Sequence, residues 1–454
     1  MKILVAGINY APDLVGIAKY TTEMCQFLRE KGHDVVVVTA PPYYPAWRIV
    51  RPYKGFVYSR EWRDGIRVVR CPMFVPKSPS AMMRILHHLS FALTCLPVLL
   101  FEALRFRPDV VLSIAPSLLT APVALSAARL VNARTWLHFQ DFEVDAAFNM
   151  NFVKGNGLRR AALWLERSLL RRVDVVSAIS AKMVDMLRDK GVPRARLMEL
   201  RNWVDTRVVT AAIDRDSKNS KPGNRDPQSR AAAWANSPID GRFPDTVRTI
   251  ALYSGSMGAK QGLDVIVEAA RNLTMHRPDI GFVLCGRGAA RAQLEAMAEG
   301  LHNVVILDLQ LTEQFGRLMA AADIHLLPQC AEIQDLVLPS KIGAMLASGR
   351  PIVGMATPGT QVAAELIDCG IVIAPGDRAA FIEAVCRLAD DQEMRRQLGA
   401  NGRLRAAERW DRNMILLQLE SRLLDLCSGR PARGRSEIKA APPASAGKEK
   451  MRAS

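Results

Sequence analysis

The chain has 454 residues, too many for one compact core, so we expect two domains. Its 49% hydrophobic and 23% charged residues exclude a mainly disordered protein, and its eight cysteines form no CxxC pair, which disfavours a zinc or redox motif. The formal net charge of +16 favours acidic partners, namely nucleic acid, an anionic membrane surface or phosphorylated substrates.

The first part of the chain, residues 1–205, alternates between predicted strands and helices. The strands are expected at KILVAG, DVVVVT, RVVRC, DVVLSI, RTWLHF and DVVSAIS, and the helices include 17–31, closed by Gly32, and 82–106. This alternation predicts an α/β fold with a doubly wound parallel sheet, a Rossmann-like domain. We interpret the N-terminus as a first buried strand rather than a signal peptide, which with scattered thiols indicates the cytoplasm.

Residues 206–246 are polar and rich in turn formers, so we expect a linker or insertion. Alternation resumes over 247–409 and predicts a second Rossmann-like domain. The helical pattern at 410–427 could pack on either domain, including back on the first, and we expect residues 428–454 to be a disordered tail. Two such domains facing each other form a cleft, and ligands of open parallel sheets bind beyond the carboxyl ends of the strands.

The stretch YSGSMGAKQGLD connects a predicted strand to a helix in the second domain. Gly255 and Gly258 allow close approach of a ligand to backbone N–H groups, and Lys260 adds a positive charge. The stretch is not a P-loop, because Ala259 and Gln261 occupy the positions where that motif requires Gly and Ser or Thr. Two interpretations remain open: a site for a nucleotide diphosphate, or a glycine-rich turn with a solvated lysine.

Two further features of the second domain could belong to the same site. Gly286 lies in a second glycine turn after the next strand, although a tight turn needs no ligand. Pro339 fits the start of a helix that would carry Ser340 and Lys341 in its first turn. A lysine is poorly placed beside the positive end of a helix dipole unless it meets an anion, and a surface lysine is the alternative.

Polar side chains follow a strand of the first domain in LHFQDFEVDA. His138, Asp141 and Glu143 are expected at the carboxyl edge of its sheet, where they either contact a ligand or are a strand-end histidine followed by helix-capping acids. Gly16 precedes the first helix and would let backbone approach a phosphate from the opposite domain. No metal site is expected, because no DxD-like signature occurs.

The segment KSPSAMMRILHHLSFALTCLPVLLFEALRFR is an apolar helix flanked by cations. We expect no membrane-spanning helix, and two interpretations remain: a helix that lies on an anionic membrane surface, or an ordinary buried helix.

Taken together, the chain resembles the retaining GT-B glycosyltransferases of family 4, and more narrowly the exopolysaccharide enzymes of the colanic-acid type. The resemblance rests on MKILVAGINYAPDLVGIAKYTTEM, TAPPYYPAW, RCPMFVPKSPS, LHFQDFEVDA, RNWVD, LYSGSMGAKQGL and DLVLPSK, and it covers about 1–205 and 249–375.

The resemblance implies transfer of a sugar from a nucleotide sugar, UDP more than GDP, with retention, without metal or other cofactor. It implies a lipid-linked saccharide acceptor at the cytoplasmic face of the inner membrane. Gly16 then faces the diphosphate, His138 lies near the reacting sugar, and Lys260 and the backbone at 339–341 hold the diphosphate.

The chain departs from the family pattern at three positions that contact the donor in relatives. Ser256 stands where many relatives have arginine, and Leu336 and Ala344 stand where they have paired glutamates. Asp335 and Glu332 are the nearest acids and the substitutes that we consider.

Other function classes fit less well. An epimerase or hydrolase of nucleotide sugars would share the fold, and a non-catalytic basic binding protein would share the charge. An NAD-dependent oxidoreductase would need a GxGxxG fingerprint, which AGINYAPD does not supply. A nucleic-acid partner is not expected, because no basic stripe interleaved with aromatic residues occurs.

Overall fold

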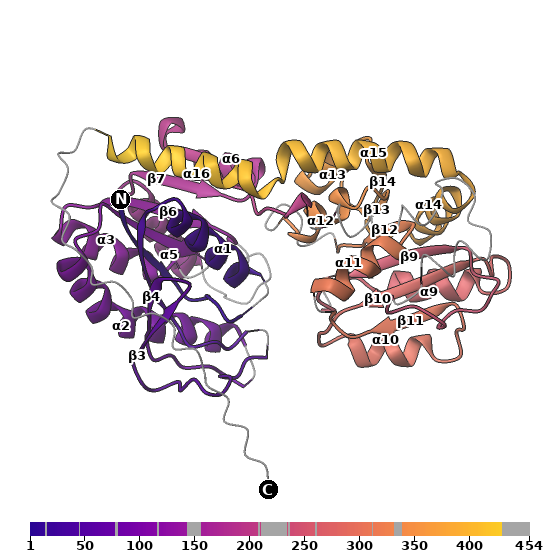
Figure 1. Cartoon of the computed structure of the whole chain (residues 1–454), viewed down its shortest axis with the longest axis horizontal. Coiled ribbons are helices and arrows are strands. Elements are labelled where there is room, and N and C mark those ends of the chain that lie inside the picture. Colours follow the sequence, from indigo (N-terminus) through magenta and orange to yellow (C-terminus); the bar gives the residue numbers. More distant parts are fainter. Residues whose placement is uncertain are drawn as a thin grey trace, which may run out of the picture.

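The protein is described from a computed structural model, which covers residues 1–13, 16–44, 46–77, 80–115, 118–142, 156–207, 209, 234, 237–258, 261–310, 312–330 and 338–428. It contains two α/β domains, each built on one sheet (Figure 1). The predicted doubly wound α/β architecture is confirmed in both.

The N-terminal domain has an eight-stranded sheet in the order β3-β4-β2-β1-β5-β6-β7-β8. Its strands are β1 (Lys2–Gly7), β2 (Asp34–Thr39), β3 (Ser59–Arg63), β4 (Ile66–Arg70), β5 (Val110–Ala115), β6 (Arg134–Phe139), β7 (Val175–Ala178) and β8 (Leu197–Glu199). All neighbouring strands pair in parallel except β3, which is an antiparallel edge strand. Its sequence, SREWR, has too few apolar residues for a strand to be predicted there. The central strands are buried on both faces, which explains their nearly continuous apolar sequences.

Helices cover both faces of this sheet (Figure 1). They are α1 (Ile17–Glu30), α2 (Ala81–Phe106), α3 (Thr120–Leu130), α5 (Asn156–Leu170), α6 (Ala181–Asp189) and the short 3-10 helix η1 (Arg194–Arg196). Serine side chains set two of the boundaries: Ser80 accepts a hydrogen bond from Met83 N at the start of α2, and Ser180 accepts one from Met183 N at the start of α6.

The C-terminal domain has a six-stranded parallel sheet in the order β11-β10-β9-β12-β13-β14. The strands are β9 (Thr249–Ser254), β10 (Ile280–Cys285), β11 (Val304–Leu307), β12 (Ile324–Leu327), β13 (Ile352–Met355) and β14 (Gly370–Ile373). The helices are α9 (Asp264–Leu273), α10 (Arg291–Ala298), α11 (Thr312–Ala321), α12 (Lys341–Ala347), α13 (Gln361–Leu366), α14 (Arg378–Asp390) and α15 (Gln392–Arg409), and α16 (Arg412–Cys427) follows in the chain. The strand order reverses between β9 and β12, which is where such sheets bind ligands.

The last helix, α16, returns to the N-terminal domain, whereas α15 stays on the C-terminal one (Figure 1). The apolar side of α16 joins the core beneath α1 and β1 through Ile415, Leu416, Leu419 and Leu423. The chain therefore crosses between the domains twice. The two crossings are hydrogen-bonded to each other, from Val204 N to Trp410 O at 2.8 Å and from Arg412 N to Val204 O at 3.1 Å.

A buried carboxylate lies beside these crossings. Glu365 of α13 is 0% exposed, and its Oε1 accepts hydrogen bonds from Arg201 and Gln361, both at 2.8 Å. Its Oε2 accepts one from Trp410 Nε1 at 3.1 Å. Arg201 follows the N-terminal sheet and Trp410 follows α15, so this carboxylate joins three segments at the domain junction.

Candidate active site

The glycine turns of the C-terminal domain lie against each other at the carboxyl ends of β9 and β10. Gly255 N donates to Cys285 O at 2.9 Å, and Met257 N donates to Arg287 O at 2.8 Å. A side chain on Gly286 would overlap the carbonyl oxygen of Gly255, and one on Gly288 would overlap that of Met257. Glycine at 286 and 288 is therefore required by loop packing, whether or not a ligand binds.

Gly255 and Gly258 have different surroundings. Gly258 N donates to the Gln261 side chain at 3.1 Å, which shapes the turn. Gly255 has a φ of 146°, and a Cβ added there would lie 3.3 Å from the ammonium of Lys341. The missing side chain at 255 thus leaves room for this lysine.

Lys341 is the first residue of α12, directly after Pro339 and Ser340. Its ammonium lies 3.9 Å from the centroid of the Tyr253 ring, a cation–π contact at the end of β9. Loss of hydration lowers the pKa of Lys341 to about 7. Among the described residues no carboxylate pairs with this ammonium, so an anion that enters here would favour its charged form and raise its pKa.

The N-terminal domain meets this site through α1. Gly16 is the N-cap of α1 with a φ of 59°, a left-handed conformation that glycine adopts without strain. Tyr20, one turn later, hydrogen-bonds through its hydroxyl with Ser340. This contact brings the first turn of α1, which Gly16 precedes, next to the start of α12, where Lys341 lies.

His138 lies in β6 with only 4% exposure. The Gln140 amide nitrogen, which can only donate, lies 3.0 Å from Nε2, so Nε2 accepts and Nδ1 carries the proton. Nδ1–H donates to Ser177 Oγ at 2.9 Å, and the same oxygen accepts from Trp136 Nε1 at 2.7 Å. Burial lowers the pKa of His138 to about 3, so the ring is neutral. In this arrangement the ring orients Gln140.

Further polar groups lie at the carboxyl edge of the N-terminal sheet. Asp13 accepts backbone hydrogen bonds from Tyr43 and Tyr44, and burial raises its pKa to about 6. Burial first, and the nearby Asp141 carboxylate second, raise the pKa of Tyr44. Asp13 and Asp141 therefore both lie close to the loop that carries these tyrosines.

An aromatic cluster consisting of Tyr43, Trp47 and His87 adjoins that loop. Ring centroids of Tyr43 and His87 are 4.7 Å apart, and those of Tyr43 and Trp47 are 5.7 Å apart. His87 Nδ1 donates to Phe74 O at 2.6 Å, which leaves Nε2 as a buried acceptor with no partner among the described residues. The sequence did not predict this cluster, although the aromatic motif TAPPYYPAW supplies two of its residues.

Three of the predicted site residues, Lys260, Asp335 and Glu143, lie outside the described residues, as do Glu332 and Leu336. Ala344, which stands in place of a family glutamate, is a partly buried residue of α12. Among the described residues, no group of three or more His, Cys, Asp or Glu side chains is arranged to hold a metal ion.

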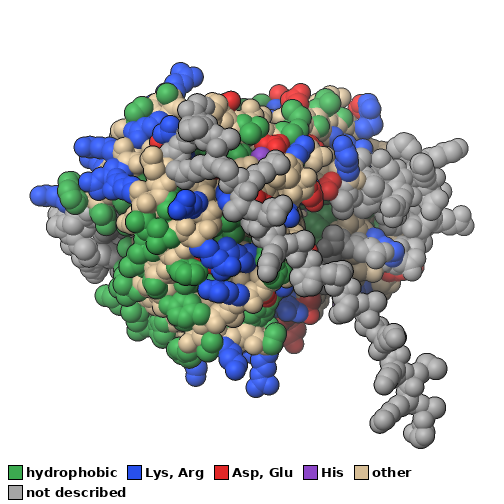
Figure 2. Space-filling view, turned by 60° about the vertical axis from the view of Figure 1, so that its left-hand side comes forward, with side chains coloured by type: hydrophobic (Ala, Val, Ile, Leu, Met, Phe, Trp, Pro, Cys, Tyr) green, Lys and Arg blue, Asp and Glu red, His purple; other side chains and the backbone are tan. Residues whose placement is uncertain are grey.

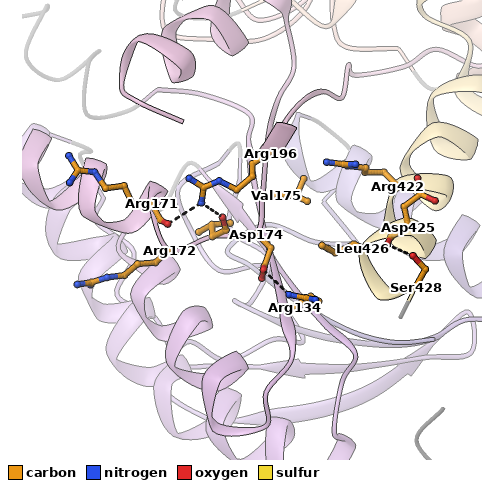
Figure 3. A pocket seen from close by; sticks show the side chains of 11 residues that line it. Arg134, Arg171, Arg172, Asp174, Val175, Arg196, Arg422, Asp425, Leu426 and Ser428 are labelled. Carbon is orange, nitrogen blue, oxygen red and sulfur yellow. Dashed lines mark hydrogen bonds and ion pairs between the residues drawn. The ribbon is translucent and has the colours of Figure 1, made fainter. Parts of the chain in front are cut away.

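A hollow of about 470 Å³ lies elsewhere, at the amino ends of β6 and β7 and the end of α16 (Figure 3). Its arginines are largely engaged: Arg134 pairs with Asp174 at 3.3 Å, and Arg196 donates to two backbone carbonyls. The side chains of Arg171 and Arg172 extend away from Arg422 in Figure 3. This hollow is at the amino ends of the strands, whereas His138 and Gln140 lie at the carboxyl ends.

The comparisons with known proteins agree with the two-domain arrangement. Residues 15–203 match the family described as "Glycosyl transferase 4-like domain", and residues 248–391 match "Glycosyl transferases group 1". The colanic acid biosynthesis glycosyl transferase WcaI of Escherichia coli (strain K12) is 40% identical over 354 residues, 77% of this chain and 82% of that protein. The chain belongs to the family 4-like glycosyltransferases. The resemblance noted in the sequence is thereby confirmed.

Solved structures show that this glycosyltransferase has the GT-B fold. The sucrose-phosphate synthase of Thermosynechococcus elongatus has a TM-score of 0.68 at 17% identity, covering 94% of this chain and 99% of that one. Anabaena Alr3699/HepE, solved in complex with UDP-glucose, has a TM-score of 0.62 at 15% identity, covering 94% of this glycosyltransferase and 100% of HepE.

Proposed function

We propose that this glycosyltransferase moves a hexose-type sugar from a nucleotide-sugar donor, a UDP-sugar in preference to a GDP-sugar, with retention, onto a lipid-linked saccharide. Its role would be in the synthesis of a colanic-acid-type exopolysaccharide. The identity with WcaI supports the pathway, and the UDP-glucose complex of HepE supports the donor class.

The position of Lys341 is the main support for the proposed donor site. Its ammonium lies at the start of α12 and beside the glycine turn of β9, and desolvation lowers its pKa to about 7. A diphosphate placed against it would gain a charge-assisted contact, and the N–H groups of Ser340 and Lys341 at the start of α12 would face the same anion. The amides of Gly255 and Gly258 already donate to Cys285 O and to the Gln261 side chain, so these glycines would contribute close approach and not donors.

This arrangement suits the chemistry of sugar transfer. When the sugar–phosphate bond breaks, negative charge builds on the diphosphate while the sugar becomes oxocarbenium-like. Fixed cations and N–H groups stabilise that charge most in a closed cleft from which water is excluded. We propose that Lys341 and Lys260 supply the cations, Gly16 allows the N-terminal domain to approach the diphosphate, and the transfer needs no metal.

We propose that His138 acts on the sugar side as a neutral group. Because its pKa is about 3, it is not a general base near neutral pH. In a retaining front-face reaction, the proton of the acceptor hydroxyl passes to a phosphate oxygen of the leaving group. His138 would position Gln140 beside the sugar, and Asp141 would contribute to the acceptor side.

We place the protein in the cytoplasm, peripheral to the inner membrane. The support is α2, the one described helix long and apolar enough to span a membrane by length and composition. Its inner face packs in the N-terminal core, which favours a helix lying on the membrane.

The first test is a thermal-shift screen against nucleotide diphosphates and nucleotide sugars. A ligand that binds only the folded protein raises Tm by mass action. We expect UDP to raise Tm, and Lys260→Ala or Lys341→Met to abolish the increase. Lys31→Ala is the control, because Lys31 caps the opposite end of α1.

If no nucleotide shifts the Tm of the folded protein, the donor site is refuted. Retention is tested separately by NMR of the new glycosidic bond: a product with the anomeric configuration opposite to the donor's would contradict it. Activity that disappears in EDTA and returns with a divalent cation would refute metal independence.

A further inference from the structure

The outward side of α2 is apolar over nearly its whole length. Its exposed apolar residues are Met82, Met83, Ile85, Leu86, Leu89, Leu93, Leu96, Phe101 and Leu104, between 36% and 70% exposed. The inward side is equally apolar: Phe91, Cys95, Leu99 and Ala103 are 0% exposed and pack on the sheet. A surface helix of a soluble protein normally turns a polar side to water.

A second element continues this apolar surface. Residues 56–62, in the loop before β3 and in β3 itself, expose Phe56 (88%), Val57 (51%), Tyr58 (49%) and Trp62 (53%). The segment lies beside α2, because the Tyr58 hydroxyl donates to Thr94 O at 3.0 Å and the Arg60 guanidinium lies 5.9 Å from the Phe101 ring centroid. In Figure 2, hydrophobic side chains gather at the lower left, with Lys and Arg side chains among them.

Most charges around this surface are positive. Of the nearby acids, Glu61 is half-buried and accepts hydrogen bonds from Arg70, and the exposed Asp64 accepts one from Gln26. The exposed charged residues of α2 are Arg84 and Arg105, with Arg107 following and Arg60 on β3. The acid of α2, Glu102, is 0% exposed and accepts two hydrogen bonds from Arg67, at 3.0 and 2.6 Å. An apolar centre with a basic rim complements a bilayer that contains anionic lipids. A second copy would instead bring arginines against arginines.

The packing of α2 fits a bilayer along the outer side of the helix and does not fit a membrane crossing. Spanning would remove Phe91, Leu99 and Ala103 from the core. It would also separate Glu102 from Arg67, which is on β4, and carry the unpaired carboxyl group into hydrocarbon. Trp62 and Tyr58 are the side chains that prefer the boundary between headgroups and acyl chains.

We propose that the outer face of α2 and residues 56–62 together form a docking surface for a bilayer containing anionic lipid. The inference deepens the proposed function and rests on it for the lipid-linked acceptor. His87 of the aromatic cluster lies in the second turn of α2 and Trp47 packs beside it, 5.4 Å between centroids. Docking along α2 therefore brings that cluster to the membrane surface, where the saccharide of a lipid-linked acceptor emerges.

The test is co-sedimentation of the full chain with phosphatidylcholine vesicles, with and without phosphatidylglycerol. The variant is Leu93→Glu and its matched control is Leu404→Glu on α15, because both leucines are 63% exposed. We expect binding only to vesicles with phosphatidylglycerol, a partition coefficient reduced at least about tenfold by Leu93→Glu, and no change with Leu404→Glu.

Any of the following results would refute the proposed docking surface. Absence of binding to anionic vesicles would do so, as would equal losses in both variants. A dimer in light scattering that Leu93→Glu dissociates would identify a second copy as the occupant. Tm with UDP separates the two proposals: stabilisation by UDP without vesicle binding refutes docking alone, and vesicle binding without stabilisation by UDP refutes the donor site alone.

Discussion

The two domains have the same kind of sheet but present different chemistry at the carboxyl ends of their strands. The C-terminal edge consists of glycine turns, backbone N–H groups and the Lys341 ammonium over Tyr253. The N-terminal edge consists of rings and titratable groups, among them Asp13, His87 and His138.

The difference indicates a division of roles. An edge of glycine turns with a lysine ammonium suits a diphosphate, which needs charge and close approach. An edge of aromatic and neutral polar side chains suits a saccharide, which offers hydroxyl groups and apolar faces. Sharing an architecture therefore does not give two domains the same ligand.

The largest effect is expected at the junction that holds the two edges together. Glu365→Ala removes the fully buried carboxylate partner of Arg201 and leaves it only the partly exposed Glu199, at a cost of about 3 kcal/mol in the free energy of unfolding. Denaturant titration measures the loss. Glu408→Ala, an exposed change on α15, is the control and should leave stability within about 0.5 kcal/mol of wild type. Equal stability of the two variants would contradict the role of Glu365.

Lys341→Met tests the anion-binding edge directly. We expect kcat/KM for the nucleotide sugar to fall roughly 10²–10³-fold, the loss typical of one preorganised donor to developing negative charge. Steady-state kinetics of donor turnover measure it. Lys31→Met should match wild type. An unchanged kcat/KM in Lys341→Met would show that the diphosphate does not bind at the C-terminal edge.

Ser177→Ala tests the sugar-side edge. It removes the oxygen that accepts from both His138 Nδ1 and Trp136 Nε1, so two buried donors lose their partner at about 1–3 kcal/mol each. Thermal unfolding should show a lower Tm, while UDP still stabilises the variant. Ser126→Ala, on the exposed side of α3, is the control. If UDP no longer stabilises Ser177→Ala, the edges are not independent.

The smallest expected effect is a pH dependence confined to the anion-binding edge. In the free protein the Lys341 pKa is about 7, and a bound diphosphate raises it, so the complex holds more protons than the free protein. The affinity for UDP should therefore fall as pH rises above 7, up to about tenfold per unit (about 1.4 kcal/mol). Calorimetry from pH 7 to 9 measures the slope, and Lys341→Met should flatten it. The same slope in Lys341→Met would exclude this lysine as the titrating group.

The sequence by itself determined both parallel sheets and the glycosyltransferase family, because buried parallel strands need continuous apolar runs that local pattern reveals. It also selected Gly16, Gly255 and Lys341, because residues that start helices or end strands have local signatures.

Only the tertiary structure decided what these residues contact. Gly286 packs against the neighbouring turn, both His138 nitrogens are engaged by side chains from β7 and the end of β6, and Glu365 collects partners far apart in the chain. The environment of the outer face of α2 could not be predicted from the sequence for the same reason. A helix that is apolar on all sides has the same sequence pattern whether it is buried on every side or lies against a membrane. Packing distinguishes these cases, because it depends on residues that are distant in sequence.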